Sequence, residues 1–452
     1  MDRRIDLTSG SITEKLIKLA LPIMGVSFIQ TAYNLIDMIW IGKMGSDAVA
    51  AVGTAGFFTW LAEAFVILTK LGVSIKVSQS IGQKNDKKTK QYIKSSLQMN
   101  IVIALLYGIW VVAWNKELIG FFNLGNDSVS QMAQTYLVTV GIGMLFFFMG
   151  PVLSGIFNGL GDSKTPFIVN MIGLATNMVL DPIFIFGLWG MPKLGVLGAA
   201  LATVIAQMMV TLCFVFLIIK RKLDYFTVHL FSKPDWQSIK EIAYIGLPGA
   251  LQSGLFTVFS MIIGKMVAYW GPTAIAAQKV GSQIEALSWL TAGGFSTAIA
   301  TYVGQNYGAG KKDRIQKGIR AIIGLAILLG IGTTLLLIFG RESLIRIFVS
   351  EIDTIEVGKQ YLLILGYSQL FMCVEITMEG AFSGMGRTYL PNIMSIVLTG
   401  ARIPLAFILI RQLGLDGIWW SISISSIIKG ILLLSVYYYL KKKDRLFKVS
   451  YL

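Results

Sequence analysis

Polar residues inside apolar stretches of this chain have types and spacings that suit the binding of a small cation. Asp37 lies in "AYNLIDMIWIG", and "NMVLDP" places Asn177 and Asp181 four residues apart, on one face of a helix. Pro182 leaves a backbone carbonyl without a donor, so carboxylate, amide and carbonyl oxygens are all available. The set predicts a sodium site, or equally a shared proton between two carboxylates. The alternative for Asp181 is a structural role in bracing the chain at Pro182.

A second group of acids lies in later apolar stretches. Glu375 and Glu379 share a helix face in "MCVEITMEG", and Glu285 lies in "GSQIEALSW". Because ionisable residues inside a membrane are costly, we interpret these acids, with Gln252 and Gln283, as a possible substrate or second ion site. Buried structural ion pairs are the alternative. The basic residues considered for such pairs are Arg402, Lys265 and Lys279.

Apolar runs of about twenty residues recur along the whole chain, as in a polytopic helical membrane protein. The chain has 452 residues, of which 55% are hydrophobic and only 14% charged, and its mean hydropathy is +0.69. No cleaved signal peptide is expected. We predict an all-α fold with twelve spans, at about 16–40, 50–76, 93–114, 130–157, 166–188, 195–219, 241–268, 274–300, 316–339, 360–383, 391–410 and 417–440.

The net charge of +15 is distributed unevenly over the connecting loops. Of the 39 lysines and arginines, 26 fall on the termini and on loops after even-numbered spans, 7 on the other loops and 6 within spans. The positive-inside rule makes the first set cytoplasmic, together with both termini, so the charge indicates topology and not nucleic-acid binding. Cys213 and Cys373 lie in apolar runs and His229 is the only histidine. No disulfide or His-based metal site is expected.

The two halves of the chain repeat one plan. Six pairs of similar segments follow in the same order, and they match Pro22 with Pro248, Gly45 with Gly271, Gly82 with Gly304, Gly155 with Gly380, Pro182 with Pro404 and Gly195 with Gly414. The pattern predicts a six-helix lobe over 1–219, a cytoplasmic linker over 220–240 and a second lobe over 241–452. Two equally oriented lobes are typical of an alternating-access transporter, with Pro22, Pro182 and Pro248 as candidate hinges.

The ordered motifs "LALP", "GIFNGLGDSKTP", "NMVLDPIFIFG" and "VGQNYGAGK" resemble those of the multidrug and toxic compound extrusion (MATE) transporters. The resemblance implies a V-shaped pair of lobes that exports organic, often cationic compounds in exchange for protons or sodium. It implies a coupling site at Asp37, Asn177 and Asp181, with Tyr136 and Thr203 as neighbours. We expect a monomer in the inner (plasma) membrane that contacts lipid and needs no cofactor besides the coupling ion.

This sequence departs from the NorM-like pattern in its second half. The seventh predicted span contains no acid, and Met372 stands where an aspartate is expected in the tenth. Both departures weaken the case for a sodium site in the second lobe. A promiscuous apolar site is expected to use aromatic side chains. The candidates are Phe57, Trp60, Phe146, Phe147, Phe256 and Trp289.

Three other classes of protein fit the sequence less well than an antiporter. A flippase for lipid-linked saccharides would line its cavity with basic residues, whereas the candidate charges here are mainly acidic. An intramembrane enzyme would need a nucleophile with a base, or a metal cluster, and the spans contain neither histidine nor a Gly-x-Ser-x-Gly motif. A channel would be expected to repeat a filter sequence. The sequence therefore favours transport, without choosing between protons and sodium.

Overall fold

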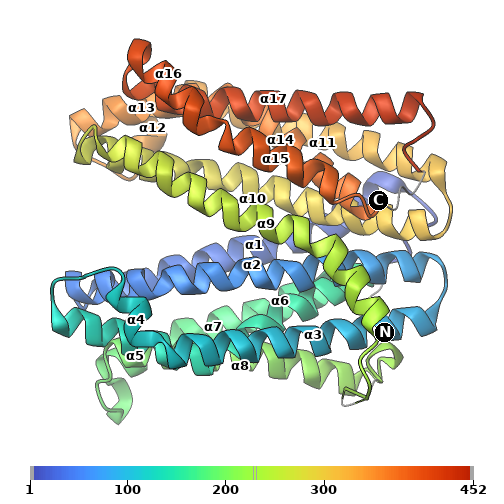
Figure 1. Cartoon of the computed structure of the whole chain (residues 1–452), viewed down its shortest axis with the longest axis horizontal. Coiled ribbons are helices and arrows are strands. Elements are labelled where there is room, and N and C mark those ends of the chain that lie inside the picture. The colour runs from blue at the N-terminus through green and yellow to red at the C-terminus, as the bar shows by residue number, and fades with distance from the viewer. Residues whose placement is uncertain (1–4, 228, 231, 448–452) are drawn as a thin grey trace. The chain divides into compact units, whose positions relative to one another are not determined.

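The computed structural model describes residues 5–227, 229–230 and 232–447, and all regular elements within these ranges are helices (Figure 1). Parts of the predicted cytoplasmic termini (1–4 and 448–452) and of the predicted linker (228 and 231) lie outside the described residues. A helix satisfies its own backbone hydrogen bonds, which is required in lipid. The helices of the first half are α1 (Ile12–Gly42), α2 (Ser46–Gly82), α3 (Asp86–Ala113), α4 (Asn115–Gly120), α5 (Asp127–Ile142), α6 (Met144–Gly159), α7 (Lys164–Phe186), η1 (Leu188–Gly190), α8 (Val196–Lys220) and η2 (Asp224–Phe226).

The second half repeats this order of long and short helices. Within it, α14 packs against α10, α11 and α17, and α10 also packs against α11. The elements are α9 (Trp236–Ala268), α10 (Pro272–Gly308), α11 (Lys312–Phe339), α12 (Arg341–Arg346), α13 (Ile352–Gly366), α14 (Gln369–Gly384), α15 (Tyr389–Gly400), α16 (Arg402–Leu413) and α17 (Leu415–Lys442).

Eleven of the twelve predicted spans correspond to candidate membrane spans among the described residues. Nine are single stretches long and apolar enough to cross a membrane, and the bent pairs α5 with α6 and α13 with α14 supply two more. The remaining predicted span, 274–300, falls on α10, which has the same length as α2. Polar residues such as Gln278 and Glu285 lower its hydropathy. Hydropathy alone therefore misses a helix that is polar because it faces a polar interior.

Two spans predicted as single helices, 130–157 and 360–383, are bent by 53° and 52°. In the first, α5 ends and α6 begins at Gly143. A Cβ atom at Gly143 would lie 2.5 Å from the side chain of Val204 on α8. Glycine therefore allows α8 to approach closely at the bend. Glycine also weakens a helix locally, which is a common cause of kinks.

The chain forms two compact units, and each half begins in the unit of the other half. One unit extends from Leu21 to Ala250, and the other contains Asp6–Ala20 and the residues from Leu251 onward. The transitions lie within α1 and α9, beside Pro22 and Pro248. Both helices, and α7 at Pro182, continue through their prolines. The hinge role of the three prolines stays a prediction, and the units begin elsewhere than the predicted lobes.

The segment before α1 is held by the connection between α10 and α11. The backbone N–H of Leu7 donates to Gln305 (3.2 Å), and Asn306 donates back to the Leu7 carbonyl (3.1 Å). Arg314 donates to the carbonyls of Leu7, Ser9 and Gly10 at 2.8–3.2 Å. The Leu7 side chain is fully buried. These contacts explain why residues 6–20 belong to the second unit.

The segment before α9 is held in an equivalent way by α2 and α3 of the first unit. Gln98 donates to the backbone carbonyl groups of Leu230 and Ser232. The carboxylate of Glu241 forms an ion pair with Lys76 and accepts a hydrogen bond from Tyr92, both at 2.6 Å. The start of each half is thus fixed by polar contacts with the other half.

The helix bounds define the register of the repeat. α4 and α12 are related by a spacing of 226, α6 and α14 by 225, and the starts of α8 and α17 by 219. Gly195 and Gly414, which precede α8 and α17, share an unusual conformation (φ 59, ψ −128 and φ 59, ψ −133). This register pairs Gly82 with Gly308 and not with Gly304. Pro182 and Pro404 are likewise offset by about one helical turn, so both of these sequence pairings were wrong in register.

Each unit contains one helix crossing that depends on a pair of glycines, and the two crossings lie at corresponding positions. A Cβ atom at Gly155 or Gly159 of α6 would lie 3.0 or 2.6 Å from a backbone oxygen of α2. A Cβ at Gly380 or Gly384 of α14 would lie 2.0 or 2.5 Å from a backbone oxygen of α10. Small residues spaced by four let helix backbones approach in membranes, where packing stabilises association. The motif "GIFNG" and its repeat "GAFSG" therefore encode a helix crossing.

This crossing gives a direct test of the fold. Gly380→Ala would bring a Cβ within 2.0 Å of the Ser296 carbonyl oxygen, and a backbone cannot yield as a flexible side chain does. We expect a loss of about 1–3 kcal/mol, measured as a lower melting temperature of the purified protein in detergent. Gly293→Ala on α10 is the control, because no atom lies within 4 Å of a Cβ there. Equal melting temperatures for the two variants would contradict the proposed packing.

Candidate ion site and cavity

Helix α7 supplies the innermost polar pair of the first unit. Asn177 and Asp181 are both fully buried, and the amide nitrogen of Asn177 donates to Asp181 Oδ1 at 3.0 Å. The predicted spacing of four thus brings the two side chains into contact. α7 remains helical through Pro182 to Phe186 and ends at Gly187, which adopts a left-handed conformation. The pair is therefore presented by a continuous helix.

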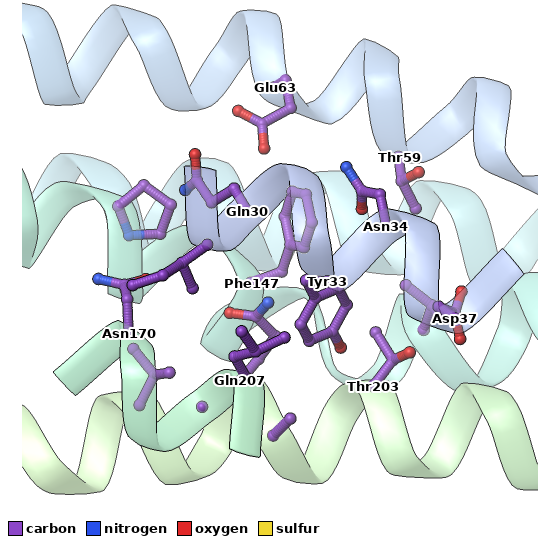
Figure 2. A pocket seen from close by; sticks show the side chains of 18 of the residues that line it. Gln30, Tyr33, Asn34, Asp37, Thr59, Glu63, Phe147, Asn170, Thr203 and Gln207 are labelled. Carbon is purple, nitrogen blue, oxygen red and sulfur yellow. The ribbon is translucent and has the colours of Figure 1, made fainter. Parts of the chain in front are cut away.

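A cavity of about 220 Å³ lies inside the same unit, between α1, α2, α5, α6, α7 and α8. Three of the predicted site residues, Asp37, Tyr136 and Thr203, line it. Figure 2 shows Asp37, Tyr33 and Thr203 together at one end of the cavity, with Asn170 toward the other. The further polar residues of the lining are Gln30, Asn34, Thr59, Glu63 and Gln207. The cavity is thus polar along much of its wall.

The two aspartates and the asparagine of the predicted site each have one buried side-chain oxygen that accepts no hydrogen bond among the described residues. These oxygens are Asp37 Oδ1, Asn177 Oδ1 and Asp181 Oδ2. Asp37 also lies near enough for its negative charge to repel that of Asp181. A buried polar atom without a partner costs about 1–3 kcal/mol, and more when it is charged. The site is therefore short of positive charge and of hydrogen-bond donors.

The charged residues that line the cavity are acids only. Asp37 and Glu63 contribute carboxylates, and no lysine or arginine is part of the described lining. Asn177 and Asp181 lie outside this lining. The carboxylates of Asp37 and Asp181, which have unused lone pairs, and the amide oxygen of Asn177 fit a sodium ion, which prefers oxygen ligands, and they fit a proton held between the acids equally well. If sodium binds, Asp37, Asn177 and Asp181 would hold it, and its charge would offset that of the carboxylates.

The second unit contains a dense polar cluster in place of such a cavity wall. Glu285 of α10 accepts hydrogen bonds from Tyr361 (2.7 Å) and Gln369 (2.6 Å). Gln369 accepts in turn from Ser288 at 2.6 Å. Glu285 is only 9% exposed. The predicted acid therefore lies in the interior, where each of its oxygens accepts a hydrogen bond from a neutral donor.

The other two acids of the second unit lie in the same cluster. Glu375 forms an ion pair with Lys429 of α17, with 2.6 Å between Oε1 and Nζ. Glu379 accepts from Gln252 at 3.0 Å, and Gln252 also donates to Ser395. The prediction that Gln252 lies beside these acids is therefore confirmed. The sequence left two alternatives open for the acids, a substrate or ion site and a buried ion pair. Glu375 forms a buried ion pair.

Arg402 is 91% buried, since its exposed fraction is 9%. Its guanidinium donates to Ser425 (2.7 Å) and Ser426 (3.1 Å), and no carboxylate oxygen of a described residue lies within ion-pair distance. The charge of Arg402 still acts on Glu285 nearby. Arg402 thus belongs to the cluster without being the direct ion-pair partner that the sequence suggested.

Three other residues named for this cluster lie outside it, and the predicted binding role of Gln283 stays a prediction. Gln283 is exposed, because it lies two residues from Glu285 and a helix turns by about 200° over that distance. Lys265 and Lys279, considered as partners for the acids, are exposed as well. The true partner, Lys429, was missed, although a lysine inside an apolar span is itself a signal. Tyr361 and Gln369 carry no such signal.

The aromatic candidates divide by position. Phe147 lines the cavity of the first unit, whereas Trp60, Phe256 and Trp289 are exposed at 64%, 50% and 45%. Phe57 and Phe146 are half-buried and lie outside the lining. An exposed aromatic on a membrane helix need not face a cavity, because lipid covers such surfaces.

A repeated helical bundle with an acid-lined internal cavity defines a multi-pass membrane transporter. The chain belongs to the MatE family, whose model matches residues 22–183 and again 248–408. The two matches begin at Pro22 and Pro248. They therefore confirm both the resemblance to MATE transporters and the duplication.

Curated relatives and solved structures agree with this family. The chain is 31% identical to a "Probable multidrug resistance protein NorM" of Thermotoga maritima, over 90% of this chain and 88% of that protein. It is 24% identical to the "Multidrug export protein MepA" of Staphylococcus haemolyticus, over 98% and 96%. A crystal structure of MATE in complex with MaD5 has a TM-score of 0.89 at 22% identity, covering 98% of this chain and 100% of that one. The last likeness supports the fold alone.

Proposed function

We propose that this chain exports organic, often cationic compounds across the plasma membrane in exchange for protons or sodium ions. The observation that carries the proposal is the cavity of the first unit, whose charged lining residues are Asp37 and Glu63. A negative, partly apolar cavity attracts amphipathic cations. The names of relatives, which describe multidrug resistance and export, support the same substrate class.

Coupling is assigned to Asp37, Asn177 and Asp181, with Tyr136 and Thr203 as neighbours. A cation or proton at the acids would offset the charge that attracts a cationic substrate, so the two ligands would compete. A ligand shifts a conformational equilibrium only by its differential affinity for the two states. Exchange follows if substrate and ion favour opposite states. Pro22, at the transition within α1, is the candidate point of bending.

The lining also argues against a flippase for lipid-linked saccharides. Such a substrate carries phosphate groups, which proteins hold with arginine and lysine. The described lining of this cavity contains neither residue. A phosphate there would meet two carboxylates and be repelled. Drug export is therefore the better proposal for the site.

The central test is Asp37→Asn, which keeps the shape of the side chain and removes its charge. We expect at least a tenfold loss of ethidium efflux from cells expressing the variant, at unchanged amounts of protein in the membrane. Asp181→Asn should behave alike. Asp47→Asn is the matched control, because Asp47 is an exposed residue in the first turn of α2. Full resistance to drugs in Asp37→Asn cells would sink the proposal.

Reconstituted protein identifies the coupling ion. Proteoliposomes loaded with ethidium would be given a proton gradient, a sodium gradient or neither, in separate experiments. The proposal expects wild-type protein to respond to one of the gradients and Asp37→Asn to respond to neither. Efflux that needs no gradient of either ion would contradict exchange.

The orientation is a second proposal, in which both termini and the basic loops face the cytoplasm. It can be tested by single cysteines in a Cys213→Ala/Cys373→Ala background. Lys87 lies in the first turn of α3, within a predicted cytoplasmic basic segment, so Lys87→Cys should react with a membrane-impermeant maleimide only after cells are opened. Asn123→Cys lies in the opposite type of loop and should react in intact cells. The reverse pattern would contradict the orientation.

A further inference from the structure

The register of the repeat assigns each cavity residue of the first unit a counterpart in the second. Gly150 of α6 corresponds to Glu375 of α14, and Val210 of α8 corresponds to Lys429 of α17. A Cβ at Gly150 would lie 3.1 Å from the Val210 side chain. At the corresponding place, the ion pair joins Glu375 and Lys429 at 2.6 Å. Corresponding positions are therefore in contact in both units. In the first unit the contact is between small apolar residues, and in the second it is between charged side chains.

The neighbouring positions follow the same rule. Tyr136 corresponds to Tyr361, and Thr59 corresponds to Glu285, which Tyr361 contacts. Asn177 corresponds to Arg402. Of the first-unit residues, Gly150, Val210, Tyr136 and Thr59 line the cavity. In the second unit, the positions that correspond to Gly150, Val210 and Thr59 thus carry charged side chains.

The charges of the polar cluster in the second unit nearly balance. Glu285, Glu375 and Glu379 face Arg402 and Lys429, so the fully ionised cluster carries one net negative charge. The side chains of Lys429 and Glu375 are only 8% and 4% exposed. Two charges are withdrawn from solvent only if each supplies the partner of the other. An ammonium group therefore already occupies the place that a small cation would take beside Glu375.

We propose that Lys429 is a tethered cation. By this we mean an ammonium group that permanently occupies the part of the second unit that corresponds to the acid-lined cavity of the first unit. With Lys429 in place, the second unit takes no alkali or ammonium ion at Glu375. Without it, the site should bind one from solution. The consequence for transport rests on the proposed function: if the acids of the first unit bind the coupling ion, exchange runs through the first unit only.

The test uses ion binding in the full-length protein, followed as thermal stability in detergent. Asp37→Asn/Glu63→Gln/Asp181→Asn removes the acids of the cavity and of the ion site in the first unit, and Lys429→Ala is then added. We expect Lys429→Ala to lower the melting temperature, and methylammonium or sodium to raise it again by about 2–4 °C in a saturable way. Choline at the same ionic strength is the control, because it is bulky and has no N–H donor. Adding Glu375→Gln should abolish the recovery.

Several outcomes would overturn the proposal. One is saturable stabilisation by sodium or methylammonium in Asp37→Asn/Glu63→Gln/Asp181→Asn protein that keeps Lys429, because the second unit would then bind an ion despite it. Another is a Lys429→Ala variant that folds and gains nothing from either ion. If Lys429→Ala does not fold, expression and purification in 100 mM methylammonium should recover it, and failure to do so counts against the tethered cation.

A matched variant separates loss of charge from loss of space. Lys429→Met fills the same volume without a charge, so it should be destabilised like Lys429→Ala but not recovered by methylammonium. Recovery of both variants to the same extent would contradict occupancy of the vacated site. These readouts do not use efflux. A failure of cation-coupled export in the wild-type protein therefore leaves the inference about Lys429 testable on its own.

Discussion

A carboxylate inside a lipid-embedded bundle must find an opposite charge or a proton within reach, and the arrangement of both units follows from this constraint. In the second unit the chain supplies the opposite charge itself, as Lys429 beside Glu375. In the first unit it supplies only the amide of Asn177 beside Asp181 and leaves an oxygen of each acid free. This deficit is the feature on which the proposed coupling role of the first unit rests.

The duplicated scaffold shows why such different interiors are compatible with one fold. The helix crossings depend on glycines at corresponding positions, Gly155 and Gly159 in one unit and Gly380 and Gly384 in the other. These contacts involve backbone and are independent of the side chains that face the interior. Interior residues could therefore diverge after duplication, one set toward a cavity and the other toward a self-neutralised cluster.

The sequence predicted the helices and the contact between Asn177 and Asp181, which are close in the sequence. It did not predict contacts between residues that are far apart in the sequence. Asn177 and Asp181 share a helix face by spacing alone, so their contact was predictable. Lys429 and Glu375 lie on α17 and α14, and no local pattern joins them. The close packing at the Gly143 bend involves Val204 of α8, which is also far away in the sequence. Gln283 shows the converse error, because closeness to Glu285 in sequence was taken for closeness in space.

The exchange of starting segments has a consequence for how such a chain could arise. Each half holds the beginning of the other half, through Arg314 and Asn306 in one case and through Glu241 and Lys76 in the other. A six-helix ancestor with the same contacts would have had to pair with a second copy to cover its own docking surface. Gene fusion would then have joined two partners that already depended on each other. Cutting the loop between the halves today would leave both of those dockings in place.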